Sequence, residues 1–287
     1  MLIFLNFKCN LLLNWYTFCV SFTDMSTAVL QRQADVKFVP EERYINDIAV
    51  VTPDTLLLSN QTEKNVQLID TRTGRVLSVV SLQGEPGGLC LTRNDQAAVA
   101  VEEKIQMIDV KGQTLTNSTV LNLRYPLSGI TKLDDTSFVL SYNVSPWLEV
   151  VTADGKVSHQ FDKNGTTQHF KRPDFLTTSV DNLIYVSDNG TNKITRLDSS
   201  LQMLQTLSSP LLSTPHDIIS ISPDQLLVCS YYNDRIVLLN TRTGKSSIIL
   251  GNKDEIHSPF SLSYCPEQKK LYVAALCTDK LNVYWLT

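Results

Sequence analysis

Two patterns of polar and apolar positions recur along the chain. In the first pattern a polar turn leads into an apolar strand, and its last apolar residue returns at steps of 41 to 46 residues. These positions are Ile48, Leu89, Ile130, Leu176, Ile218 and Leu262. In the second pattern an apolar strand, a polar turn and an alternating strand follow one another, and the matching positions are Val66, Ile105, Leu148, Ile194, Ile236 and Leu281. Because the two series advance together, the sequence predicts six copies of one structural unit.

Each unit has the content of a propeller blade. Apolar and polar residues alternate in segments such as Val66–Ile69 and Ile194–Leu197, which is typical of half-buried strands. Polar turns follow these strands, among them two copies of Thr-Arg-Thr-Gly at Thr71 and Thr241, and lead into a fourth strand in five copies. No long stretch keeps a helical period with caps. The sequence therefore predicts an all-β protein, a six-bladed β-propeller of four-stranded antiparallel blades with about 24 strands.

The sixth copy ends after its third strand, and a segment near the N-terminus can supply the missing one. A blade short of a strand would leave an unpaired edge, which favours aggregation. We expect Val36–Val39, within the alternating segment 34–40, to pair with Leu281–Trp285 and close the ring. The other interpretation makes this segment a loose linker. With the closing strand, the propeller spans residues 34–287 and residues 1–33 form an N-terminal extension.

The first 24 residues are apolar and aromatic, yet they make a poor targeting signal. A signal peptide carries its positive charge before the apolar stretch, whereas Lys8 lies inside it. The stretch is also too interrupted by polar residues to span a membrane. Met25 opens a sequence typical of a cytosolic start. We expect a cytoplasmic protein that binds no membrane; cleavage after Ser21, which would make residues 1–21 a signal peptide, is the alternative for a secreted protein.

Composition narrows the function classes. With 43% hydrophobic and 19% charged residues, the chain is not disordered. Its net charge of −4 disfavours binding to DNA or RNA through bulk charge. The six Cys and four His are scattered without zinc-ligand spacing, so we expect free thiols, no metal and no cofactor. The scattered cysteines favour a reducing compartment.

Two segments resemble the core of the NHL repeat. They are YVSDNGTNKI at Tyr185–Ile194 and CSYYNDRIVLL at Cys229–Leu239, whose NKI and DRI triplets match the start of the third strand of that repeat. Ser128–Ile130 is similar to its first-strand motif. The Asn-His-Leu triplet that names the family is never intact here, and WD repeats differ because the sequence holds no Trp-Asp pair. The resemblance covers the chain from about Ala34 to the end.

The resemblance implies a six-bladed propeller that recognises a partner. NHL propellers often form the C-terminal, partner-recognising end of tripartite-motif ubiquitin ligases. The RING and B-box modules of those ligases need clustered Cys and His, which this sequence lacks. We therefore expect a non-catalytic recognition propeller related to ubiquitin-ligase pathways of proteasomal degradation, without ligase chemistry of its own.

A candidate binding site lies on one rim of the predicted propeller. The loops that lead into first strands share this rim with the loops between second and third strands. Exposed Tyr, Trp and Arg supply most of the binding energy at protein interfaces. The candidate residues are Tyr44, Arg124, Tyr125, Tyr142, Trp147, Arg172, His216, Tyr231, Tyr232 and Phe260. We expect Tyr142, Trp147, Tyr231 and Tyr232 to form the centre of a protein-binding site; for any single ring, packing between blades is the alternative.

A second interpretation makes the same rim an RNA site. Arg124, Lys171 and Arg172 could contact phosphates while Tyr125 and Tyr142 stack on the bases of single-stranded RNA, as in some relatives of the NHL family. Acidic residues on the same rim oppose this interpretation.

A third interpretation is enzymatic. Six-bladed propellers of the gluconolactonase and paraoxonase type hold a divalent cation in the axial channel, and such a cation needs several oxygen ligands. Asp47 and Asp217 could point at the axis as its ligands, with His216 as a base. Two carboxylates are few for such a site. The alternative is that both accept hydrogen bonds from the backbones of neighbouring first strands.

Overall fold

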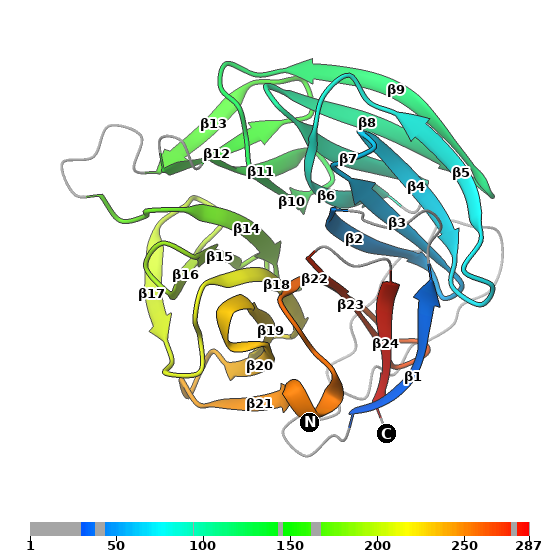
Figure 1. Cartoon of the computed structure of the whole chain (residues 1–287). Coiled ribbons are helices and arrows are strands. Elements are labelled where there is room, and N and C mark those ends of the chain that lie inside the picture. Colours follow the sequence, from blue (N-terminus) through cyan, green and yellow to red (C-terminus); the bar gives the residue numbers. More distant parts are fainter. Residues whose placement is uncertain are drawn as a thin grey trace, which may run out of the picture.

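The computed structural model describes residues 30–37, 44–93, 95–142, 146–161, 168–276 and 280–286. These residues form 24 strands, β1 to β24, and two 3-10 helices of three residues each. The strands make six antiparallel four-stranded sheets, which Figure 1 shows as blades around a common centre. The predicted fold class is therefore confirmed. No helix in the described parts of the chain has the length and apolar character that a membrane crossing requires.

The first three blades follow the chain without interruption, from the innermost strand outward. Blade I contains β2 (Ile45–Thr52), β3 (Thr55–Asn60), β4 (Asn65–Asp70) and β5 (Val76–Ser81). Blade II contains β6 (Pro86–Arg93), β7 (Gln96–Val101), β8 (Lys104–Lys111) and β9 (Thr114–Asn122). Blade III contains β10 (Gly129–Asp134), β11 (Ser137–Tyr142), β12 (Trp147–Thr152) and β13 (Val157–Phe161).

The last three blades repeat this order, and the sixth combines both ends of the described chain. Blade IV contains β14 (Pro173–Thr178), β15 (Ile184–Asp188), β16 (Lys193–Leu197) and β17 (Met203–Ser208). Blade V contains β18 (Pro215–Ser222), β19 (Gln225–Ser230), β20 (Arg235–Asn240) and β21 (Ser246–Leu250). Blade VI contains β22 (Pro259–Cys265), β23 (Lys270–Ala275), β24 (Lys280–Leu286) and β1 (Leu30–Lys37).

Ring closure follows the sequence prediction. Strand β1 pairs antiparallel with β24, so that Val36 lies opposite Leu281 and Leu30 lies opposite Leu286. The strand begins at Leu30, within the segment that the sequence assigned to the extension. The rest of the predicted closing strand, residues 38–40, lies outside the described residues, as do residues 1–29. An N-terminal strand thus completes the blade that the C-terminal strands begin.

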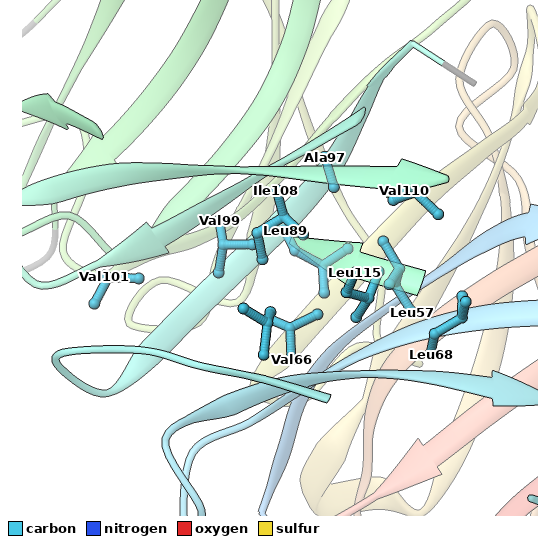
Figure 2. Close-up of a cluster of buried hydrophobic side chains, with 11 residues drawn as sticks. Leu57, Val66, Leu68, Leu89, Ala97, Val99, Val101, Ile108, Val110 and Leu115 are labelled. Carbon is cyan, nitrogen blue, oxygen red and sulfur yellow. The ribbon is translucent and has the colours of Figure 1, made fainter. Parts of the chain in front are cut away.

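The hydrophobic core is divided into six clusters, each between two neighbouring blades. Figure 2 shows the cluster between blades I and II, where Leu57, Val66 and Leu68 of one blade face Leu89 and Val99 of the next. All five side chains are at most 5% exposed. Burying one Leu or Val contributes about 1.5–3 kcal/mol, so each cluster fixes the relative placement of two blades. Loops on adjacent blades are thereby held in fixed positions.

Two smaller expectations also hold in the described part of the chain. The glycines of the two Thr-Arg-Thr-Gly turns, Gly74 and Gly244, have φ angles of 69° and 70°, which non-glycine residues rarely adopt. Cys90, Cys229 and Cys265 carry free thiols. Cys9, Cys19 and Cys277 lie outside the described residues.

Candidate functional site

One end of the propeller gathers the loops that the sequence analysis singled out. We call it the start face, because the first strand of each blade begins there and the second strand turns into the third there. Backbone hydrogen bonds join the two kinds of loop: Gln61 N–H donates to Tyr44 O at 2.8 Å, and Asn189 N–H donates to Arg172 O at 3.1 Å. The other strand turns lie at the opposite face. The two kinds of loop that the predicted rim combines therefore lie on one face.

The candidate residues on this face differ widely in exposure. Tyr232 is 73% exposed, Tyr44 43% and Tyr125 37%, and the side chains of Arg124 and Arg172 also lie in solvent. Intermediate exposure is shared by His216, Tyr231 and Phe260. Buried positions are taken by Tyr142 and Trp147. The aromatic residues therefore do not form one uniform surface.

Tyr142 and Trp147 belong to the core rather than to the exposed centre of the rim. They face each other across β11 and β12, with ring centroids 4.2 Å apart and an interplanar angle of 7°. Only 1% and 3% of their surfaces are exposed, because they pack in the cluster between blades II and III. The Tyr142 hydroxyl donates to buried Glu149, and burial together with this carboxylate raises the pKa of Tyr142. The expectation that these two rings form the surface of a binding site is wrong.

Five aromatic residues of blades IV to VI form a separate group, which we call the His216 cluster: Phe175, His216, Tyr231, Tyr232 and Phe260. The His216 ring lies 4.6 Å from Phe260 and 4.9 Å from Tyr231, between ring centroids. Tyr231 in turn contacts Tyr232 at 5.3 Å. Phe175, which the sequence analysis did not propose for the rim, lies 5.5 Å from both His216 and Phe260. Exposure rises through the cluster from buried Phe175 to Tyr232.

His216 is neutral near pH 7. Burial, and secondarily the positive charge of Arg172, lower the pKa of its imidazole to about 4. Its Nδ1 atom is buried and has no hydrogen-bond partner among the described residues. A neutral imidazole packs against aromatic rings as an apolar plate, so His216 acts as one more ring of the cluster.

Beside this cluster, blade IV presents positive charge. Lys171, Arg172 and Lys193 are all exposed at its start-face end. Arg172 is 61% exposed and contacts Asp174 at 3.5 Å between Nη2 and Oδ2. The Asp188 carboxylate is turned inward, where it accepts the backbone N–H groups of Lys171 at 3.0 Å and Arg172 at 2.8 Å. The sequence analysis did not assign this role to Asp188, although Asp188 is the last residue of β15, where a carboxylate can accept the N–H groups of a neighbouring loop.

Near the axis, Asp47, Ser261 and Asp217 form what we call the axial trio. The Ser261 hydroxyl lies 3.0 Å from Asp47 Oδ1 and 2.9 Å from Asp217 Oδ2. Asp47 also accepts the N–H of Leu89 from blade II at 2.7 Å, and Asp217 accepts the N–H of Leu262 from blade VI at 2.7 Å. The expectation that both carboxylates accept hydrogen bonds from neighbouring first strands is thus confirmed.

The axial trio shares protons between its members. One hydroxyl proton serves only one carboxylate at a time, so the second carboxyl must carry its own proton to bond to Ser261. Burial raises the pKa of Asp47 well above its usual range, and the nearby charge of Asp217 raises it further. Burial also raises the pKa of Asp217 to about 6. The trio therefore bonds blades I, V and VI together around the axis.

The hydrogen bonds of Asp47 and Asp217 also affect whether these carboxylates can bind a metal ion at the axis. Each of the four carboxylate oxygens of Asp47 and Asp217 accepts a backbone N–H. Besides Leu89 and Leu262, the donors are Ile48 to Asp47 at 2.8 Å and Ile218 to Asp217 at 2.7 Å. Within the described residues there is no group of three or more His, Cys, Asp or Glu side chains placed to hold a metal ion. The carboxylates are thus arranged for strand bonding rather than for an oxygen cage.

Comparison with solved structures places this chain in the β-propeller class. A protein of unknown function from Bacteroides thetaiotaomicron aligns with a TM-score of 0.73 and 13% identity, over 91% of this chain and 76% of that one. A catalytically inactive virginiamycin B lyase from Staphylococcus aureus, solved with quinupristin, aligns with a TM-score of 0.65 and 15% identity, over 91% and 100%. The Swd1 propeller domain from Myceliophteria thermophila gives 0.60 and 14%, over 85% and 84%. At these identities the likeness defines the fold alone.

No protein-family model matches the sequence, and no curated protein matches it. The repeat family of the blades and the activity of the protein are therefore treated as proposals below.

Proposed function

We propose that this chain is a non-catalytic recognition propeller that binds a protein partner through the His216 cluster on its start face. The observation that carries the proposal is Tyr232, a ring 73% exposed that stands on a packed group of aromatic side chains. Aromatic residues at the edge of such packed groups are frequent anchors of protein interfaces. Tyr44 and Tyr125, exposed on the same face, extend the surface that a partner can contact.

The loop that carries Tyr231 and Tyr232 is held in place before any partner binds. Asp234 closes the short helix of Tyr231–Asn233 with a left-handed φ of 51°. Its carboxylate accepts the N–H of Ser258 from blade VI at 2.7 Å. An anchor on a preorganised loop loses little conformational entropy on binding, which supports a role in recognition.

The finer part of the proposal concerns the pathway. The resemblance of Tyr185–Ile194 and Cys229–Leu239 to the NHL repeat supports a recognition component related to ubiquitin-ligase pathways, acting in the cytoplasm. Fold alone does not fix function, so this part rests on those motifs.

Affinity purification of the full chain with paired variants tests the proposal. Partners identified with the wild type should be lost from Tyr232→Ala combined with Tyr44→Ala. They should be kept by Trp285→Ala, which removes a ring 41% exposed at the C-terminal end of β24, on the opposite face. Circular dichroism of each variant checks the fold. Retention of every partner by the start-face variant would refute the proposal.

The same preparations separate the other two functions. Release of the captured material by ribonuclease would favour a single-stranded RNA site at Arg124 and Arg172. Chelator-sensitive hydrolysis of a lactone or ester, abolished by Asp47→Ala, would favour the enzymatic interpretation.

A further inference from the structure

Acidic and basic side chains of the start face are placed differently on blades IV to VI. Glu255 is exposed, but three other acidic side chains are used internally. Asp188 accepts the N–H groups of the loop that precedes β14, and Asp234 accepts the Ser258 N–H. Asp254 accepts the Gly251 N–H at 2.9 Å. A carboxylate that accepts backbone donors is turned away from solvent and projects less negative charge outward.

The cations of blade IV have the opposite placement. Lys171, Arg172 and Lys193 are exposed, and within the described residues neither lysine forms a salt bridge. Arg172 contacts Asp174 with one Nη only, at 3.5 Å, which leaves most of the guanidinium N–H groups facing solvent. An exposed ring is thereby set beside three exposed positive charges.

We infer that the partner's docking segment is an acidic peptide with an aromatic or other apolar side chain, whose ring packs on Tyr232 while its carboxylates face Lys171, Arg172 and Lys193. The inference rests on the proposed function and specifies its partner. Arg forms bidentate bonds with carboxylates, and Lys supplies an adaptable point charge. An acidic peptide satisfies both the charge and the apolar ring of this surface.

The ring geometry disfavours single-stranded RNA as the occupant. Base stacking needs a series of open ring faces along a basic groove. Here the successive rings are tilted against each other by 43° to 65°, and Tyr232 is the one member of the described cluster with most of its surface exposed. Lys171, Arg172 and Lys193 gather on blade IV instead of following a groove. A short peptide with one anchoring ring matches this arrangement better.

A binding assay with defined polymers tests the inference. The probe is a fluorescently labelled random copolymer of glutamate and tyrosine, compared with a copolymer of lysine and tyrosine and with oligouridylate. Wild-type protein should bind the glutamate copolymer at least about tenfold more tightly than either comparator, which corresponds to about 1.4 kcal/mol. Affinity should fall as salt rises, because the cations are solvated.

Three variants assign the effect to residues. Lys171→Glu combined with Arg172→Glu should weaken binding about tenfold or more, as expected when charge-assisted bonds become repulsions. Arg242→Glu is the matched control, since Arg242 is 74% exposed on the opposite face and pairs with Asp224 at 3.2 Å. It should leave affinity within about twofold. Tyr232→Ala should weaken binding about 30-fold, the usual effect of losing an anchoring ring.

The outcomes distinguish the inference from the proposed function. If Tyr232→Ala loses binding and the charge reversals at Lys171 and Arg172 have no effect, the inference of an acidic partner is overturned. The proposal that the His216 cluster binds a protein then still stands. Tight binding that is indifferent to Tyr232→Ala overturns both. Equal or tighter binding of the lysine copolymer or of oligouridylate, or no binding of the glutamate copolymer, overturns the acidic partner.

Discussion

Replacement of Asp217 by Asn should greatly reduce an unusual pH dependence of stability that originates in the axial trio. Burial raises the pKa of Asp217 to about 6 in the folded protein, against its ordinary value of 3.8 in the unfolded chain. A raised carboxyl pKa means that the folded state binds its proton more tightly than the unfolded state does. The contribution to the free energy of unfolding is therefore complete below about pH 4 and is lost as pH rises through about 6.

The difference between the two pKa values sets the magnitude. It corresponds to about 3 kcal/mol, and the full amount is lost between about pH 4 and pH 7. Asp217→Asn cannot titrate, and it also removes the charge that raises the pKa of Asp47. The variant also carries a destabilisation that does not depend on pH, because the amide NH₂ of Asn cannot accept the backbone N–H that one oxygen of Asp217 accepts in the wild type. Its decrease in stability with rising pH should nevertheless be much smaller than that of the wild type.

Urea unfolding monitored by tryptophan fluorescence at several pH values measures this effect. The free energy of unfolding of the wild type minus that of Asp217→Asn should fall by about 2–3 kcal/mol between pH 4.5 and pH 7.5. Asp198→Asn provides a control of opposite sign, since hydrogen bonds from Ser200 and Gln202 lower the pKa of Asp198. The free energy of unfolding of the wild type minus that of Asp198→Asn should stay constant between pH 4.5 and pH 7.5 and change only at lower pH. A flat or rising difference for Asp217→Asn would refute the shared-proton interpretation of the trio.

Three further changes test the fold and the assignment of the aromatic residues. Trp147→Ala should cost about 3–5 kcal/mol in urea unfolding, since it empties a buried site, whereas Trp285→Ala should cost less than about 1 kcal/mol. Gly129→Ala should lower the urea midpoint, because an added Cβ would overlap the backbone carbonyl of Asp174, with a cost of about 1–3 kcal/mol. Deletion of residues 1–37 should lower the melting temperature by about 10 °C or more by exposing β24, while deletion of residues 1–29 should not; equal melting temperatures would contradict ring closure.

The blades could be predicted from the sequence because every blade repeats the same local pattern. The second-pattern residues, such as Val66, Ile105 and Ile194, all lie buried in third strands. The closing strand was also predictable, since the missing strand of the sixth copy left one edge to be paired. Its start at Leu30 was not, because the edge of a repeat has no neighbouring copy to define it.

The aromatic rim was predicted less well, for a reason visible in the strands. Tyr142 and Trp147 were assigned to a turn, yet Tyr142 continues the alternation of Phe138 and Leu140, which places all three on one buried face. Following the two-residue alternation to the last residue of the strand, Tyr142, would have predicted that this ring is buried. The axial trio depends instead on closure of the ring, since Ser261 meets a carboxylate 214 residues away, and no local pattern encodes that contact.

Pairing of the first strand with the last has a consequence for synthesis. Strand β1 ends at Lys37, and its partner begins at Lys280, so nearly the whole propeller is translated between them. At usual elongation rates β1 waits about 12–50 s on the ribosome without its partner. One apolar face of blade I also stays uncovered during this time, because the hydrophobic cluster between blades VI and I includes Leu281 and Val283 of β24. The nascent chain thus exposes an unpaired strand and an open apolar face until β24 has been translated. In the folded protein the two ends of the described chain lie on a single blade, where a circular permutation could join them and open the ring elsewhere.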